Sequence, residues 1–81
     1  MRLFILGIFL ALSACGLSKN AVASDHGGCP ADHPIKGNVN QVSGEKIYHL
    51  PGDPYYRRTN AEECFANAED ARNAGYRASK R

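Results

Sequence analysis

An uncharged apolar run near the amino terminus is the feature that most limits what this chain can fold into. The run covers residues 3–12 and follows Arg2. It is much shorter than the ~20 apolar residues that a permanent membrane-spanning helix needs. A basic residue followed by a short apolar run is typical of a bacterial export signal. A buried core helix is the alternative, but no other segment of the 81 residues is apolar enough to surround it.

Two processing sites follow the run, and they predict different mature proteins. Residues 12–15 (LSAC) resemble a lipobox, where the peptidase cuts before a lipid-bearing cysteine, here Cys15. Residues 21–23 (AVA) resemble the A-x-A site of the ordinary signal peptidase. We favour the lipobox because it directly follows the apolar run. The predicted signal peptide is therefore 1–14 and the product a membrane-anchored lipoprotein of the cell envelope; the alternative is cleavage after 23 and a periplasmic or secreted protein.

The cysteine count also depends on this processing. Three cysteines are an odd number for an exported protein, in which an unpaired thiol is a liability. Either cut restores an even number, because Cys15 is acylated in one case and removed in the other. We expect the remaining two, Cys29 and Cys64, to form a disulfide, which would stabilise the domain by about 3 to 4 kcal/mol. Two free thiols are the alternative and would leave a thin core without a crosslink.

Composition divides the mature chain into a linker and a domain. Residues 15–34 are rich in Ser, Asn, Gly, His and Pro and contain few large aliphatic side chains. Such a segment cannot bury enough apolar surface to fold by itself, which predicts a flexible tether. The single compact domain is expected over 35–81, as a monomer.

Local patterns within 35–81 predict extended structure first. Residues 45–50 alternate in polarity, which favours a strand with Ile47 facing inward. Pro-Gly-Asp-Pro at 51–54 predicts a tight turn, and 55–58 would then form a second short extended segment. Residues 59–63 have capping-box spacing and would open a single helical turn.

A short helix is expected near the carboxyl terminus. Asn67 can cap a helix over 68–74, and Gly75 can end it in a left-handed conformation. Because a helix this short is unstable alone, it must dock on the sheet through its alanines, with Phe65 beneath it. The predicted fold class is α+β: a very small β-hairpin sheet with one short C-terminal helix, after an N-terminal signal helix and a flexible tether.

Four short motifs carry a family resemblance. They are IKGN at 35–38, GEKIYHLPG at 44–52, YY at 55–56 and EDARNAGYR at 69–77. In this order they resemble the sunset domain, a small module of exported bacterial proteins that is also attached to secreted thermonuclease-like proteins. Some relatives are labelled succinoglycan biosynthesis proteins. The resemblance implies a domain over 35–81 and does not by itself imply a function.

The same segment is more distantly similar to the zinc-binding module of Ada-type DNA-repair proteins. That module holds zinc through four thiolates, whereas His49, Asp53 and Ser79 stand at the corresponding positions here and the chain ends at Arg81 before the fourth. These residues do not make a closed structural zinc site. We therefore expect no metal and no cofactor, with the disulfide taking the place of the metal as the crosslink.

Other candidate chemistry in the sequence is weak. His26, Cys29 and His33 have metal-like spacing, but they lie in the predicted tether and Cys29 is expected in the disulfide. His49, on a strand beside Tyr48, is more consistent with a structural residue than with a general base. The chain contains no Gly-rich phosphate loop and no nucleophile elbow. We predict that it is not an enzyme.

Basic and aromatic residues gather in the last third of the chain. The candidate polyanion-binding residues are Tyr55, Tyr56, Arg57, Arg58, Arg72, Arg77, Lys80 and Arg81. Cations interleaved with aromatic rings suit phosphate contacts and base stacking. A solvated face balanced by nearby carboxylates is the alternative, and a net charge of +2 favours it over strong non-specific binding.

Two functions follow from these observations. The first is a lipid-anchored, non-catalytic interaction module whose partner is an envelope protein or polymer. The second is an accessory module that binds nucleic acid or acidic polysaccharide weakly, linked to extracellular nuclease or exopolysaccharide systems.

Overall fold

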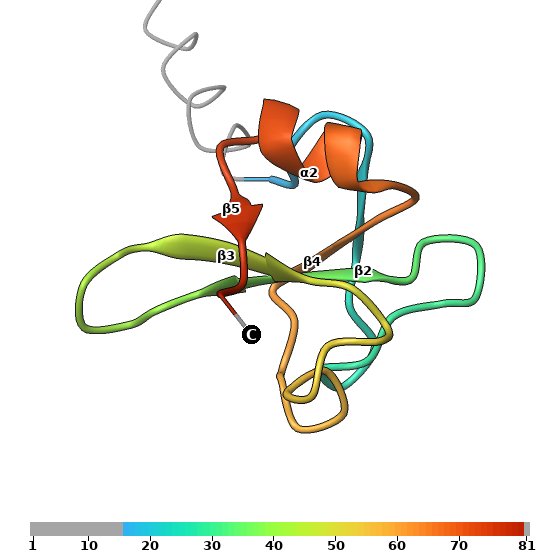
Figure 1. Cartoon of the computed structure of the whole chain (residues 1–81). Helices are drawn as coiled ribbons and strands as arrows, with labels where there is room; N and C mark the ends of the chain where they lie inside the picture. Colours follow the sequence, from blue (N-terminus) through green and yellow to red (C-terminus); the bar gives the residue numbers. More distant parts are fainter. Residues whose placement is uncertain (1–15, 81) are drawn as a thin grey trace, which may run out of the picture.

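A computed structural model describes residues 16–80 of the chain (Figure 1). The predicted signal peptide over 1–14 and its helix, the lipid site Cys15, and Arg81 lie outside the described residues. Within 16–80, no helix is long and apolar enough to cross a membrane.

The described residues form a five-stranded mixed sheet with one short helix near the carboxyl terminus, which confirms the predicted α+β class. The elements are β1 (Ala21–Ala23), β2 (Ile35–Val39), β3 (Lys46–His49), β4 (Glu63–Phe65), α2 (Ala68–Asn73) and β5 (Arg77–Ala78). The strand order is β1-β4-β2-β3-β5. Only β5 runs parallel to its neighbour, β3, and the other pairs are antiparallel.

The β-hairpin is made by β2 and β3. The predicted strand over 45–50 is confirmed as β3, and the tight turn Asn40–Gly44 connects it to β2. The Asn40 side chain accepts the backbone N–H groups of Val42 and Ser43, and Gly44 has a φ of 79°, which suits a glycine. Val42, at the tip of this turn, is 97% exposed.

Two predicted elements between β3 and α2 are wrong. Residues 55–58 form turns instead of an extended segment, because Asp53 and Lys36 bind their backbone and curl the chain. The helical turn predicted over 59–63 does not form either. There Glu62 N–H donates to Gly37 O at 2.8 Å and Glu63 begins β4, so pairing with β2 overrides the capping-box pattern.

The C-terminal helix follows its local signals. The Asn67 side chain accepts the N–H of Asp70 at 2.8 Å, and Gly75 ends the helix with a φ of 95°. Tyr76 N–H then returns to Ala71 O at 3.0 Å. Ala71 is fully buried, so the six-residue helix is held by docking on the sheet, as predicted.

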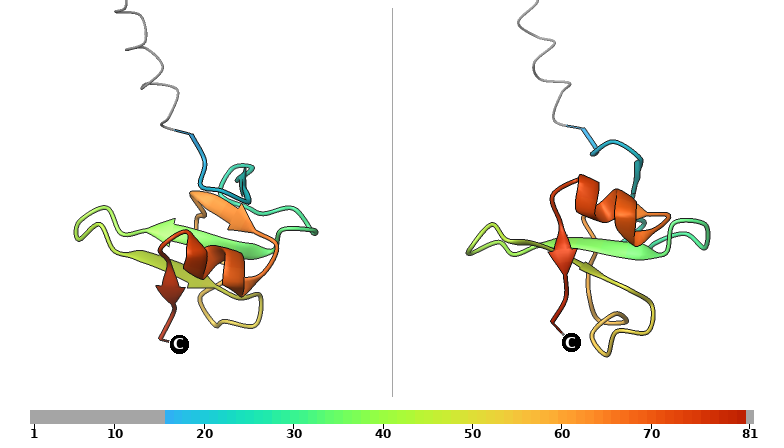
Figure 2. Two further views of the ribbon diagram at one scale, coloured as in Figure 1. Left: turned by 90° about the horizontal axis from the view of Figure 1, so that it is seen from above. Right: turned by 45° about the horizontal axis from the view of Figure 1, so that its top comes forward.

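The core lies between the sheet and α2 (Figure 2). It contains Ile35, Tyr48, Phe65, Ala71 and Tyr76. The predicted inward position of Phe65 is confirmed, whereas that of Ile47 is wrong. Ile47 is half-buried and its neighbour Tyr48 is in the core, because α2 covers the opposite face of β3.

Gly37 makes the close contact between sheet and aromatic residues possible. A Cβ atom at this position would lie 2.8 Å from the ring of Tyr76 and 3.1 Å from that of Phe65. These two rings meet edge to face, with centroids 5.4 Å apart. The centre of β2 therefore has to be a glycine for the Tyr76 and Phe65 rings to approach it this closely.

The segment predicted as a flexible tether contributes a strand to the sheet, β1 over Ala21–Ala23. β1 pairs with the free edge of β4, with Val22 opposite Cys64. Before β1, Ser18 donates to the Glu63 carboxylate from its backbone N–H at 2.6 Å and from its hydroxyl at 2.9 Å. Composition missed this, because a polar segment that cannot fold alone can still add a strand to an existing sheet.

The predicted disulfide between Cys29 and Cys64 is confirmed, with a Cα–Cα distance of 5.6 Å. Cys64 is fully buried in β4, so the bond attaches the amino-terminal segment directly to an inner strand of the sheet. Disulfides persist in oxidising compartments, which indicates an extracytoplasmic location.

Candidate interaction surfaces

The segment Asp53–Thr59, which we call the basic turn, lies beneath the sheet on the face opposite α2 (Figure 1). Side chains alternate along a strand, so Lys36 points to the face opposite to that of Ile35 and Gly37. Ile35 and Gly37 lie toward the core and α2. Lys36 therefore reaches the basic turn from the sheet.

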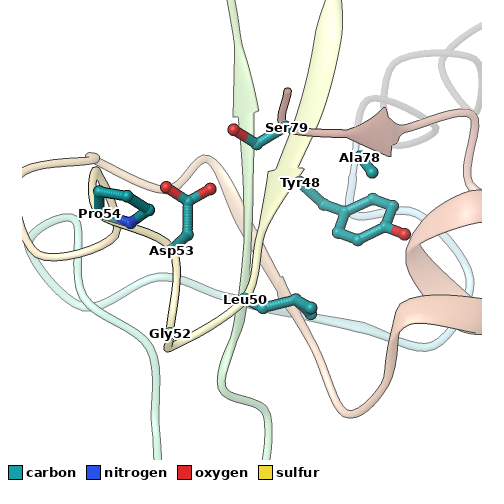
Figure 3. A pocket seen from close by; sticks show the side chains of 7 residues that line it. All are labelled: Tyr48, Leu50, Gly52, Asp53, Pro54, Ala78 and Ser79. Atoms are coloured by element: carbon teal, nitrogen blue, oxygen red, sulfur yellow. The ribbon is translucent and has the colours of Figure 1, made fainter. Parts of the chain in front are cut away.

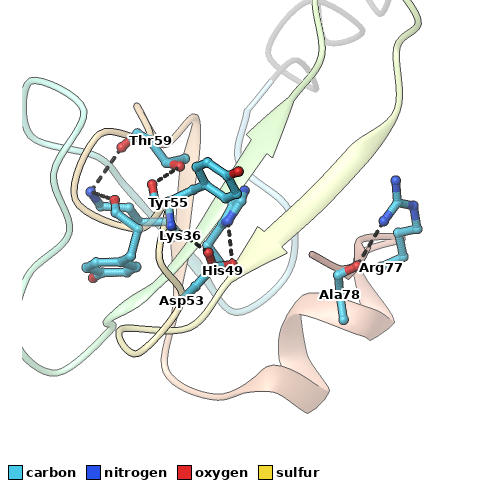
Figure 4. Close-up of polar contacts among 8 residues, drawn as sticks. Lys36, His49, Asp53, Tyr55, Thr59, Arg77 and Ala78 are labelled. Atoms are coloured by element: carbon cyan, nitrogen blue, oxygen red, sulfur yellow. Dashed lines mark hydrogen bonds and ion pairs between the residues drawn. The ribbon is translucent and has the colours of Figure 1, made fainter. Parts of the chain in front are cut away.

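Lys36 is a buried cation that holds the basic turn. It is 7% exposed, and its Nζ donates to Tyr56 O at 2.8 Å and to Thr59 O at 2.9 Å (Figure 4). The ammonium also lies 4.3 Å from the centroid of the Tyr56 ring. Within residues 16–80, no carboxylate forms an ion pair with Lys36. Its burial is offset by carbonyl oxygens and an aromatic face instead of an acid.

His49 and Asp53 form a second, largely buried attachment. His49 Nδ1 donates to Asp53 Oδ2 at 2.8 Å, and the Asp53 side chain is 4% exposed. The other oxygen accepts the N–H of Tyr55 at 2.7 Å, and Ser79 adds a further side-chain hydrogen bond. Burial raises the pKa of Asp53, but the hydrogen bonds from Tyr55, His49 and Ser79 outweigh it and hold the pKa below its usual value.

This arrangement suits a positioning role better than proton transfer. Both oxygens of Asp53 and the Nδ1 of His49 are engaged in hydrogen bonds within the protein. Their combined effect is to fix where the chain reverses after β3 and where Tyr55 lies. The three positions that resembled zinc ligands, His49, Asp53 and Ser79, do come together, but as a hydrogen-bonded cluster.

Further contacts of its own side chains hold the basic turn in place. The Tyr56 hydroxyl donates to Pro34 O at 2.6 Å, and the Thr59 hydroxyl donates to Tyr55 O at 2.7 Å. The guanidinium of Arg58 lies 4.4 Å from the centroid of the Tyr55 ring. Arg57 and Arg58 are both exposed. The turn is thus rigidly held from inside while its two arginines face solvent.

The eight predicted polyanion-binding residues do not form one surface. Tyr55, Tyr56, Arg57 and Arg58 lie together in the basic turn, although Tyr56 faces inward. Arg72 is on α2, where its Nη1 donates to the Tyr48 hydroxyl at 3.1 Å, and Arg77 is on β5, where its Nε pairs with Glu45 at 2.7 Å. Lys80 is exposed after β5, and Arg81 lies outside the described residues.

A shallow groove of about 380 Å³ lies at the β5 edge of the sheet (Figure 3). Tyr48, Leu50, Pro54 and Ala78 supply apolar walls, and Asp53 and Ser79 supply polar groups. Sequence analysis missed this groove. It exists only because β5 returns to pair in parallel with β3 and brings Ala78 beside Tyr48, which no local pattern predicts.

The metal-like spacing in the amino-terminal segment does not make a metal site. Cys29 is in the disulfide, and His33 Nδ1 lies 3.1 Å from its exposed neighbour Asp32. Over the part of the chain that the structure describes, no three His, Cys, Asp or Glu side chains lie close enough together to hold a metal ion.

A family model described as ArfC matches residues 16–78. No curated protein and no solved structure matches the chain. The family match contradicts the resemblance to the sunset domain, and with it the distant likeness to Ada-type modules. The motifs behind that resemblance are local strand, turn and helix signals, and they omit the amino-terminal segment that both the family match and the sheet include.

Proposed function

The chain belongs to the ArfC family over residues 16–78, and from this premise we propose that it is a small, non-catalytic interaction module of the bacterial envelope, anchored by lipid at Cys15. The observation that carries the proposal is the Cys29–Cys64 disulfide, which crosslinks the segment that follows the anchor to β4, an inner strand of the sheet. Its partner would be an envelope protein or polymer.

The position of β1 supports the lipobox over the alternative cleavage site. Cleavage after Ala23 would remove all of β1 and the hydrogen bonds between Ser18 and Glu63. Cleavage before Cys15 leaves both intact. A protein processed at the lipobox would therefore keep the complete five-stranded sheet.

Ser18 also determines how close the domain would be to the membrane. Ser18 lies three positions after Cys15 in the sequence, and an extended chain spans at most about 3.5 Å per position. A lipid on Cys15 would therefore hold the domain within about 10 Å of the membrane surface. The module would act at the membrane surface and would not reach far from it.

The proposal that the module is non-catalytic is supported by the state of its buried polar groups. Asp53 and His49 hold each other and the backbone of the basic turn. Glu63, the other partly buried acid near the core, accepts from Ser18 and from the Tyr76 hydroxyl. Each of these groups has a structural task.

The anchor is tested by fractionating cells that express the wild-type chain or Cys15→Ser. We expect the wild-type protein in the membrane fraction, with a lipid adduct on Cys15 in the intact mass, and the variant in the soluble fraction or retained as precursor. Cys29→Ala/Cys64→Ala is the matched control and should remain with the membrane. A mature wild-type chain that begins at Ser24 would refute the anchor.

The interaction role is tested by photo-crosslinking in whole cells. A crosslinking amino acid at Leu50, in the groove, should give a discrete adduct. The same residue at Val42, on the exposed hairpin tip, is the control for random collision. Equal labelling from the two positions would count against a specific partner at the groove.

A further inference from the structure

We propose that the basic turn binds an anionic glycan, meaning a polysaccharide that carries carboxylate, sulfate or phosphate groups. This deepens the proposed function by naming the chemical class of its partner. It rests on that function only for the orientation of the domain at the membrane.

The two arginines of the turn are the first observation. Within residues 16–80, neither Arg57 nor Arg58 forms an ion pair with a carboxylate. The other described arginines of the domain are engaged, since Arg72 donates to a tyrosine hydroxyl and Arg77 pairs with a glutamate. Guanidinium groups bind planar anions through paired, charge-assisted hydrogen bonds. Adjacent exposed arginines therefore offer a site for such groups.

Lys36 is the second, independent observation. Its ammonium is buried directly behind the turn and has no carboxylate partner among the described residues. A buried charge is screened less than an exposed one, so it contributes to the potential outside the turn. The one acid of the turn, Asp53, is turned inward and hydrogen-bonded to His49. The solvent side of the turn is consequently cationic.

The rigidity of the turn is the third observation. Lys36 holds the carbonyls of Tyr56 and Thr59, Asp53 holds the N–H of Tyr55, and Thr59 holds the carbonyl of Tyr55. A surface loop braced in this way loses little conformational entropy when it binds. Binding loops on a rigid scaffold are a common location for recognition.

The geometry favours a glycan over nucleic acid and over lipid. Single-stranded nucleic acids bind by stacking bases on aromatic faces. Here Arg58 covers one face of Tyr55, and the Tyr56 ring packs on Lys36. Binding of the turn to lipid headgroups is disfavoured by its position. Ser18, close to the proposed anchor, binds Glu63 on the helix face of the sheet, whereas the basic turn lies on the opposite face. The turn would point away from the membrane that holds Cys15.

The test measures binding of the purified, oxidised protein to heparin and to polygalacturonate, with single-stranded DNA and phosphatidylglycerol vesicles as comparison probes. Arg57→Gln/Arg58→Gln removes the proposed site without touching the core. Lys19→Gln/Lys80→Gln removes the same charge from other exposed positions and is the matched control. We expect the first variant to lose at least about tenfold in glycan affinity and the control to change by less than about twofold.

Equal losses in the two variants would overturn the proposal, because binding would then follow net charge alone. Failure of the wild-type protein to bind either glycan, or tighter binding to DNA or to vesicles than to both glycans, would also overturn it. Membrane fractionation distinguishes a failure of the glycan site from a failure of the proposed lipid anchor. Arg57→Gln/Arg58→Gln should stay in the membrane fraction, so a failed glycan assay with an intact anchor refutes only the glycan site.

Discussion

Reduction of the Cys29–Cys64 disulfide should destabilise the domain by about 4 kcal/mol. The bond closes a loop with a sequence separation of 35. For a loop of this length, the chain-entropy relation gives about 3.8 kcal/mol at 25 °C. Stabilities of small domains are about 5–15 kcal/mol, so this is a large share of the total. Reduction is the right perturbation because Cys64 is fully buried, and substitution by alanine would add the cost of a cavity.

The assay is urea unfolding of the wild-type protein with and without reductant. The structure predicts that the urea midpoint shifts strongly, because residues 16–34 would then be held without a covalent bond, by the β1–β4 pairing and a few hydrogen bonds such as Ser18–Glu63 and Tyr56–Pro34. Cys29→Ala/Cys64→Ala is the control and should not respond to reductant. A difference of less than about 1 kcal/mol between oxidised and reduced protein would show that the loop-entropy argument fails here.

Three further predictions test the core, the helix and the acid response. Gly37→Ala should lower stability by about 1 to 3 kcal/mol, measured by thermal unfolding, because its Cβ would lie 2.8 Å from the Tyr76 ring; an unchanged melting temperature would contradict that packing. Asn67→Ala should cost about 1 kcal/mol in urea unfolding through loss of the helix cap, with Asn73→Ala, exposed at the end of α2, as the control. Burial raises the pKa of Glu63, but hydrogen bonds from Ser18 and Tyr76 lower it further, so its folded pKa is below the usual value. The stability that the Glu63 carboxylate contributes is present above its unfolded pKa of about 4.3 and is lost as pH falls through its folded pKa. Glu63→Gln should therefore reduce the dependence of the unfolding free energy on pH between about pH 5 and 3. The same pH dependence in the variant and the wild-type protein would contradict the lowered pKa of Glu63.

The basic turn shows how far sequence patterns predict a site. The cluster Tyr55–Arg58 is visible in the sequence, and four of the eight predicted polyanion-binding residues do lie together there. The pattern could not show that Tyr56 faces inward or that Arg77 is engaged by Glu45. Nor does it mark Lys36 as the residue that holds the turn, because the two are far apart in the sequence.

Local signals determined the elements that depend only on neighbouring residues. The helix cap at Asn67, the left-handed Gly75 and the extended conformation of β3 depend on residues a few positions apart, and all three were predicted correctly. The disulfide was predictable because the parity argument left only Cys29 and Cys64 to pair.

Tertiary contacts decided the rest. Alternation predicts that β3 has two faces, but only the docking of α2 selects the face of Tyr48 over that of Ile47. In the same way, Ala21–Ala23 form a strand because β4 offers a free edge for pairing, and the disulfide to Cys64 holds the chain that follows β1. Burial and strand pairing are satisfied between residues distant in the chain, and their free energy exceeds the weak local preferences that sequence patterns record.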